Sequence, residues 1–247
     1  DNMRFGSSNP VFRKLAKENI GVAEGFATAT YLGIAGKSLF YLLITVLGAG
    51  LGLFLMSTNP SALASLLGVG IVVAFVTALI SFIKPNITKY TGTIYCFAEG
   101  LVLGTISLFF ELEIPGIVIS AVISTFAVVF VVSALYLTGI VKVTKKFVRF
   151  LTIFALSFIF SQLVLFLLSL FIPNLVNPFG GYGMIVSVIS CALAIFYLFF
   201  DLEVIRNTVE SGQPKFLEWF AAFGIVYTTL WVYIEILRLL AIFARRD

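Results

Sequence analysis

The chain has 247 residues, of which 60% are hydrophobic and only 11% are charged, and its mean hydropathy is +1.11. Soluble domains contain roughly 25% charged residues, so this composition excludes a soluble globular protein and predicts a chain whose solvent is the lipid bilayer. The net charge is +4. Because the basic residues lie in short loops, we interpret them as a topology signal and not as a nucleic-acid-binding surface.

Residues 1–37 precede the first long apolar segment, and we expect them to form a cytoplasmic N-terminal segment. Four apolar side chains within it share one helical face at their spacing: Val11, Phe12, Leu15 and Ile20. An amphipathic helix with basic neighbours lies in the membrane interface, so a short interfacial helix is expected here. A basic tail without that helix is the alternative. We expect the remaining residues, 38–247, to form one transmembrane domain.

Apolar segments of membrane-spanning length recur along the chain. A helix needs about 20 apolar residues to cross the hydrocarbon core, and within lipid each backbone segment must satisfy its own hydrogen bonds. The segments cover residues 38–57, 62–83, 90–110, 116–138, 147–172, 181–202 and 224–243. The sequence therefore predicts an all-α polytopic membrane protein with seven transmembrane helices. The alternative is six spans and a re-entrant last segment.

The distribution of Lys and Arg predicts a cytoplasmic N-terminus. With that orientation, the cytoplasmic segments hold Lys37, Lys84, Lys89 and the basic run in "KVTKKFVR", whereas the loops on the other side hold no Lys or Arg. An excess of basic residues marks the cytoplasmic side. The tail "ARRD" is the exception, because seven spans place its basic residues on the other side. A re-entrant last segment would return the tail to the cytoplasm.

The charged side chains inside predicted spans or at their ends include Glu99, Asp201, Glu235 and Arg238. A charge at mid-bilayer costs about 2.5–3.5 kcal/mol on insertion scales, so each of these residues is a candidate for function. Glu235 and Arg238 are three residues apart and are predicted to pair on one helix face. Glu99 precedes a Gly-x3-Gly spacing that lets another helix approach closely.

The remaining acidic and thiol residues near the spans have simpler interpretations. Glu203 and Arg206 are three residues apart, which predicts an ion pair at the surface. Cys96 and Cys191 lie in the middle of apolar segments, where we expect packing thiols and no disulfide.

Our principal hypothesis places Asp201 and Glu235 together in an internal cavity. Two carboxyl groups in one dry site titrate as a coupled unit, so the pair would hold one proton when closed and lose it on opening. Deprotonated, it would offer oxygen ligands for weak, transient binding of Ca2+, because two carboxylates fall short of the six to eight oxygens that Ca2+ prefers. The helical rise, however, separates the two residues in depth by about 15 Å.

The sequence resembles the Bax-inhibitor family of membrane proteins, also called the transmembrane BAX-inhibitor-motif family, and specifically its bacterial branch. The resemblance covers the whole chain in span number and is most specific over residues 194–243, where "YLFFDLEVIRN" is followed by "LWVYIEILRLLAIF". It implies a central seventh helix wrapped by six others and a pH-sensitive calcium leak. The family's acidic pair corresponds to Asp201 and Glu235, and this correspondence favours their pairing despite the depth difference.

The chain departs from the family pattern in three respects. Glu235 stands where an aspartate is usual, the loop between the two acids is longer, and the second span has no carboxylate. These departures bear on the gating and on the identity of the ion.

The expected function is therefore a pH-sensitive cation (Ca2+) leak channel, with Asp201 and Glu235 as pH sensor and ion pathway and with Arg238 and Glu99 as tuning or pathway residues. The alternatives are a proton-coupled secondary transporter and a non-conducting scaffold that regulates stress or cell death. We expect no enzymatic activity and no cofactor, because the sequence has no histidine and lacks a recognisable catalytic cluster.

The expected partners are the bilayer, transported cations and anionic lipids at the basic loops. The expected location is a bacterial inner membrane.

Overall fold

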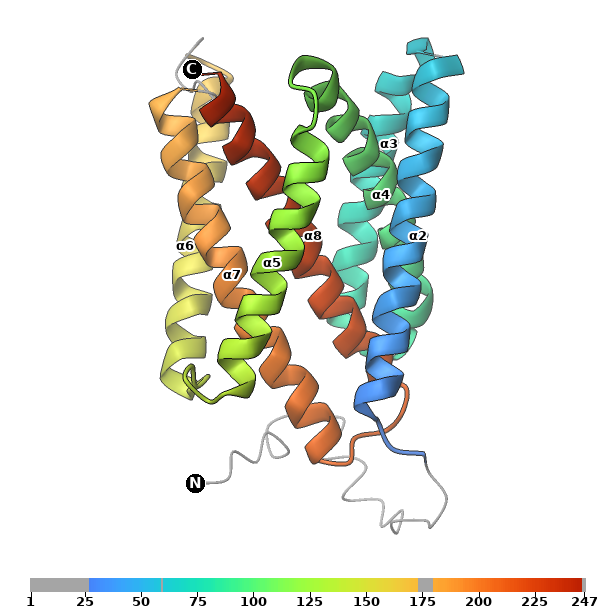
Figure 1. The fold of residues 1–247 in the computed structure, drawn as a ribbon, viewed down its shortest axis with the longest axis vertical. Coiled ribbons are helices and arrows are strands. Elements are labelled where there is room, and N and C mark those ends of the chain that lie inside the picture. The colour runs from blue at the N-terminus through green and yellow to red at the C-terminus, as the bar shows by residue number, and fades with distance from the viewer. Residues whose placement is uncertain (1–26, 59, 173–179, 246–247) are drawn as a thin grey trace.

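The described chain forms a bundle of long helices that run along one common direction (Figure 1). The computed structural model describes residues 27–58, 60–172 and 180–245. The interfacial helix predicted around residues 11–20 lies outside these ranges. The helices are α2 (Tyr31–Thr58), α3 (Pro60–Ile83), α4 (Thr88–Glu113), α5 (Ile117–Leu137), α6 (Lys145–Ser169), α7 (Gly181–Glu210) and α8 (Leu217–Ala244), with a short 3-10 helix, η2 (Pro85–Ile87).

This architecture confirms the predicted all-α membrane fold. Within the described ranges, six helices are long and apolar enough to cross a membrane, and α3 contains a shorter apolar stretch, Leu67–Ile83. Several helices extend beyond the predicted spans: α2 begins at Tyr31, α7 continues to Glu210, and α8 begins at Leu217. Charges near these ends are paired: Lys37 in α2 with Glu218 in α8, and Arg206 with Glu210 in α7.

The last helix, α8, crosses the whole bundle on a diagonal (Figure 1). Its 28 residues span about 42 Å at the helical rise. It contributes Phe223 to one buried cluster, Val232 to a second and Leu237 to a third. An uninterrupted helix of this length favours a full span over the re-entrant alternative, and its residues in three buried clusters agree with the expected central position of the seventh span.

The two helices α2 and α4 approach each other closely through glycines on both sides. A Cβ atom added at Gly100 would collide with the Thr45 backbone, and one at Gly104 would lie 2.6 Å from the Cα of Ala49. On α2, a Cβ at Gly48 would collide with the Phe97 carbonyl oxygen. The Gly-x3-Gly spacing after Glu99 thus makes the close crossing that the sequence predicted.

The connection between α7 and α8 is held by the chain that precedes α2. After α7, Gly212 adopts a left-handed conformation, with φ of +62°. The Ala29 amide then donates to the Gln213 carbonyl at 2.8 Å, and the Lys215 amide donates to the Ala27 carbonyl at 3.1 Å. The segment that precedes α2 is thereby joined to the connection between α7 and α8.

A buried ion pair completes this junction. Glu218 is fully buried, and its carboxylate accepts from the Thr30 amide at 2.8 Å and from the Lys37 ammonium group. The same ammonium group lies 5.2 Å from the centre of the Trp219 ring. We call residues 27–30, Lys37 and residues 213–219 the junction. Lys37 can lie inside α2 because this carboxylate and ring neutralise and shield its charge.

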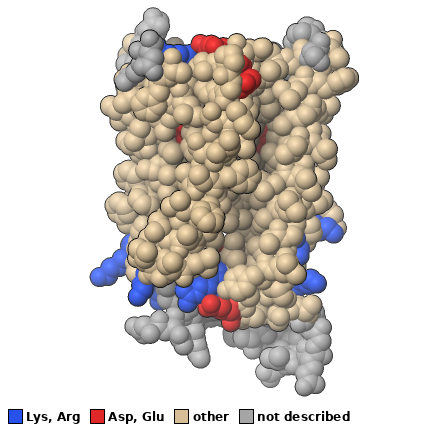
Figure 2. All heavy atoms as spheres, viewed as in Figure 1, with Lys and Arg blue, Asp and Glu red and all other residues tan. Residues whose placement is uncertain are grey.

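On the face shown in Figure 2, most charged residues lie near the two ends of the bundle, and the surface between them is largely uncharged. The basic loops that follow α3 and α5 lie at the end that also carries the junction (Figure 1). At the opposite end, Arg245 pairs with Glu113 at 2.6 Å. This ion pair neutralises Arg245, which lies at the end of the bundle where the distribution of Lys and Arg predicts few basic residues.

Replacing Gly48 by alanine should destabilise the protein, whereas the matched change Gly50→Ala on the same helix should not. A Cβ at Gly50 meets no packing neighbour within 4 Å. Overpacking costs about 1–3 kcal/mol, and alanine is favoured over glycine inside a helix by roughly 0.5–1 kcal/mol. Thermal unfolding in detergent should give a lower midpoint for G48A only. Equal midpoints would contradict the close crossing of α2 and α4.

Replacing Glu218 by glutamine should destabilise the protein strongly, because it leaves the Lys37 ammonium group without its carboxylate. Breaking a buried ion pair costs about 3–5 kcal/mol. The control is Glu210→Gln, which removes the exposed pair with Arg206 and should change stability by at most about 1 kcal/mol. Denaturant unfolding of both variants checks this. A Glu218→Gln variant as stable as Glu210→Gln would show that the junction contributes little.

Candidate functional site

The candidate site lies along the contact between α7 and α8, which run in opposite directions. Ser190 on α7 faces Glu235 on α8, and Asp201 on α7 faces Gly224 on α8. The two contacts fit one antiparallel register. Ser190 and Asp201 are eleven positions apart on α7, and Gly224 and Glu235 are eleven positions apart on α8. The acidic residue of each helix therefore faces a small residue of the other.

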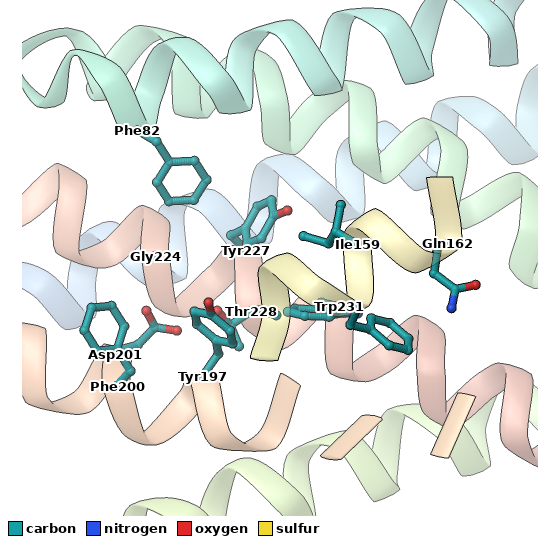
Figure 3. Close-up of a pocket in the computed structure, with 12 residues that line it drawn as sticks. Phe82, Ile159, Gln162, Tyr197, Phe200, Asp201, Gly224, Tyr227, Thr228 and Trp231 are labelled. Carbon is teal, nitrogen blue, oxygen red and sulfur yellow. The ribbon is translucent and has the colours of Figure 1, made fainter. Parts of the chain in front are cut away.

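Asp201 is buried, with 8% of its surface exposed. Its carboxyl group lies against the backbone of α8, because Gly224 has no side chain: a Cβ there would be 3.2 Å from Oδ1. The Thr228 hydroxyl is its neighbour one turn along α8 (Figure 3). Oδ2 is buried and has no hydrogen-bond partner among the residues that the structure describes. A buried polar group without a partner is costly, so this oxygen marks a site that another group can complete.

A cavity of about 480 Å³ lies beside this carboxyl group. Figure 3 shows the Asp201 side chain directed from α7 toward the cavity, with Gln162 at the opposite end. Among the described residues that line the cavity, Asp201 is the single charged one, and most of the others are aromatic or aliphatic. The walls come from α3, α6, α7 and α8: Phe82, Ala155, Phe158, Ile159, Gln162, Tyr197, Phe200, Asp201, Gly224, Tyr227, Thr228 and Trp231.

Glu235 lies in a separate hydrogen-bonded network. It is 5% exposed, and its Oε1 accepts a hydrogen bond from the Ser190 hydroxyl at 2.8 Å. The Ser190 oxygen in turn accepts from the Trp231 indole at 3.1 Å. Arg238 lies 3.4 Å from Oε2, which confirms the predicted pair. Because Trp231 also lines the cavity, the indole and Ser190 connect the cavity wall to Glu235.

The structure does not bring Asp201 and Glu235 into one site. Eleven residues of helix separate Gly224, which faces Asp201, from Glu235. At the helical rise this is about 16 Å along α8. The depth difference derived from span positions therefore holds, and the pairing that the resemblance implied is not formed in this structure. The chain has two separate carboxyl sites at different depths.

Glu99 belongs to neither of these two sites. It is half-buried on α4 near Tyr95 and Tyr227, and no hydrogen bond or ion pair links it to another residue within the described ranges. Tyr227 also lines the cavity, so Glu99 lies behind one cavity wall.

The predicted pair of Glu203 with Arg206 is wrong. Glu203 accepts from the Tyr136 hydroxyl at 2.6 Å and from the Asn207 amide at 3.0 Å. Arg206 instead pairs with Glu210, four residues further along α7, at 3.1 Å. Because α5 lies beside α7, a tyrosine replaces the arginine as the partner of Glu203. The prediction for the thiols is confirmed, since Cys96 and Cys191 are both free.

The donor set for a metal ion is small. Within the part of the chain that the structure describes, no group of three or more Asp, Glu, Cys or His side chains could hold a metal ion. Each carboxylate would therefore bind a cation through one side chain, with the remaining ligands supplied by water or neutral oxygens.

Sequence reasoning missed the small and neutral residues that define the site. Ser190, Gly224 and Thr228 carry no charge, and the cavity's aromatic residues look like ordinary apolar positions of a span. One signal was present: Ser190 precedes Asp201 by eleven residues, as Gly224 precedes Glu235. Eleven residues are close to three helical turns, so the acid and the small residue of each helix lie on one face. When the two helices run antiparallel, the acid of each lies opposite the small residue of the other.

A comparison with known protein families gives a match that covers almost the whole chain. The family model described as "Bax inhibitor 1 like" matches residues 9–245. No curated protein matches the chain.

Replacing Ser190 by alanine should destabilise the protein, because it removes one hydrogen-bond partner from both Trp231 and Glu235. Leaving buried polar groups unsatisfied costs about 1–3 kcal/mol. The matched control is Ser187→Ala, one turn earlier on α7, where the fully buried hydroxyl has no partner in the described structure and its loss should be neutral or stabilising. Thermal unfolding compares the two variants. Equal destabilisation would contradict a role for Ser190 in holding Glu235.

Proposed function

We propose that this chain, which belongs to the Bax inhibitor 1-like family of membrane proteins, is a pH-sensitive cation leak channel that passes Ca2+. The observation that carries the proposal is the buried Asp201 carboxyl group, with its unpartnered Oδ2 beside a cavity inside the helix bundle. Ionisable residues within membrane spans commonly mark ion pathways.

The separation of the two carboxyl groups supports two successive cation sites instead of one site in which both groups share a proton. Asp201 lies nine residues before the end of α7 at Glu210, and Glu235 lies nine residues before the end of α8 at Ala244. At the helical rise each lies about 14 Å from one end of the bundle. A cation would move between them past the Trp231 indole and Ser190, which connect the cavity to Glu235. Arg238 would weaken cation binding at the second site.

Both sites would bind Ca2+ weakly, and weak binding suits passage. Ca2+ prefers six to eight oxygen ligands, whereas each site offers one carboxylate and a few neutral oxygens. Conduction requires that an ion enters a site and also leaves it readily.

Protonation would control the leak. A protonated carboxyl group offers no charge to a cation, and it loses its proton as the pH rises. The cation flux is therefore expected to increase as the pH rises.

The environment that supports this function is a bilayer, which the apolar helices indicate. We propose a bacterial inner membrane with the basic end of the bundle in the cytoplasm, following the distribution of Lys and Arg. The basic loops there would contact anionic lipids.

Replacing Asp201 by asparagine should lower Ca2+ flux into liposomes about tenfold or more, because contacts with a charged group contribute roughly 1.5–3 kcal/mol. Replacing Glu235 by glutamine should have a similar effect, and both variants should lose much of the dependence of flux on pH. The measurement is the fluorescence of an entrapped Ca2+ indicator over a series of external pH values.

The control is Glu203→Gln, an acidic residue of the same helix that contacts Tyr136 and Asn207 and lies outside the cavity lining. It should leave both flux and pH dependence unchanged. If both site variants conduct Ca2+ with the parent pH dependence, the assignment of these residues is wrong. Substrate uptake against its gradient would support proton-coupled transport instead of a leak.

A further inference from the structure

We propose that the cavity beside Asp201 binds a lipophilic organic cation, such as a quaternary ammonium compound with an aromatic or alkyl substituent. This inference concerns a ligand distinct from the transported metal ion. It does not depend on whether the protein conducts Ca2+.

The shape and lining of the cavity suit an organic molecule. Its volume of about 480 Å³ falls within the range of small-molecule sites, which also form preferentially between the helices of bundles. Six of the residues that line it are aromatic and come from four helices: Phe82, Phe158, Tyr197, Phe200, Tyr227 and Trp231. Several of these rings face the cavity in Figure 3.

The charge of the cavity selects a cation. Among the described residues, Asp201 is the single charged one in the lining, and its buried Oδ2 has no partner there. A positive group placed there would supply the missing partner of the carboxylate. The faces of Tyr, Phe and Trp rings also attract cations, most strongly where water is excluded.

The same lining disfavours a metal ion as the occupant of the whole cavity. A hard cation such as Ca2+ needs a shell of oxygen ligands, whereas most of the wall is aromatic or aliphatic carbon. An organic ammonium ion is weakly hydrated and covered with apolar groups, so it can contact carbon and a carboxylate at the same time. Combined aromatic and carboxylate contacts are therefore the chemistry that recognises an organic cation.

The position of the cavity allows such a ligand to enter from the bilayer. Phe82 on α3 and Ile159 on α6 both line the cavity and are exposed, with 46% and 61% of their surfaces accessible. The cavity thus borders the apolar outer surface of the bundle, where a lipophilic cation is concentrated from solution.

The test compares benzyltrimethylammonium with neopentylbenzene, a neutral molecule of the same shape in which carbon replaces the charged nitrogen. The full chain is placed in nanodiscs and carries Trp219→Phe, so that Trp231 in the cavity wall is the remaining tryptophan. The fluorescence of Trp231 is then titrated with each probe, with empty nanodiscs correcting for partition into lipid. We expect saturable binding of the cation and at least about tenfold weaker binding of the neutral probe.

Two variants assign the site. Asp201→Asn should weaken binding of the cation about tenfold or more and remove the preference for it, whereas Glu203→Gln should bind like the parent. Phe158→Leu keeps the carboxylate and most of the volume, and should weaken cation binding several-fold by removing one ring. This second variant preserves the test if Asp201→Asn does not fold.

Equal binding of the two probes that survives Asp201→Asn would overturn the proposal, since it would show a site for apolar chains such as lipid. Absence of saturable binding by either probe would overturn it as well. Cation binding that is unchanged by both Asp201→Asn and Phe158→Leu would place the ligand elsewhere.

Discussion

The antiparallel contact between α7 and α8 is the constraint on which the arrangement of charges depends. Its register places a small residue opposite each buried acid, Gly224 opposite Asp201 and Ser190 opposite Glu235. A shift of one helical turn, about 5.4 Å, would bring a larger residue such as Thr228 to the position of Gly224 and crowd the carboxyl group. The packing of the two helices therefore determines which acid is hydrogen-bonded and which keeps a free oxygen.

The difference between the two carboxyl sites follows from their partners. Glu235 is held by a serine and an arginine, so its charge is compensated within the bundle. Asp201 lies against backbone and one hydroxyl neighbour and faces an aromatic cavity. The first arrangement holds its carboxylate through two protein partners, and the second leaves one carboxyl oxygen open to an arriving proton or cation. One pair of helices thus provides two acidic groups in different surroundings.

Much of the fold was predictable, because span length and hydropathy depend only on local composition. The close crossing next to Glu99 and the pair of Glu235 with Arg238 were also predictable, since both follow from spacing on one helix. The helical rise placed Asp201 and Glu235 at different depths correctly, whereas the family resemblance favoured their contact. The cavity could not be predicted, since it arises where side chains of four helices fail to fill the space between them. The partner of Glu203 was missed for the same reason, because Tyr136 comes from another helix.

The junction also has a consequence for biosynthesis. Lys37 and its partner Glu218 are 181 positions apart in the chain, and a ribosome adds roughly 5–20 residues per second. About 10 to 40 s therefore pass between the synthesis of α2 and that of its partner in α8. During that interval the Lys37 ammonium group lacks its carboxylate partner. The ion pair that joins α2 to α8 therefore forms only after the last helix has been synthesised.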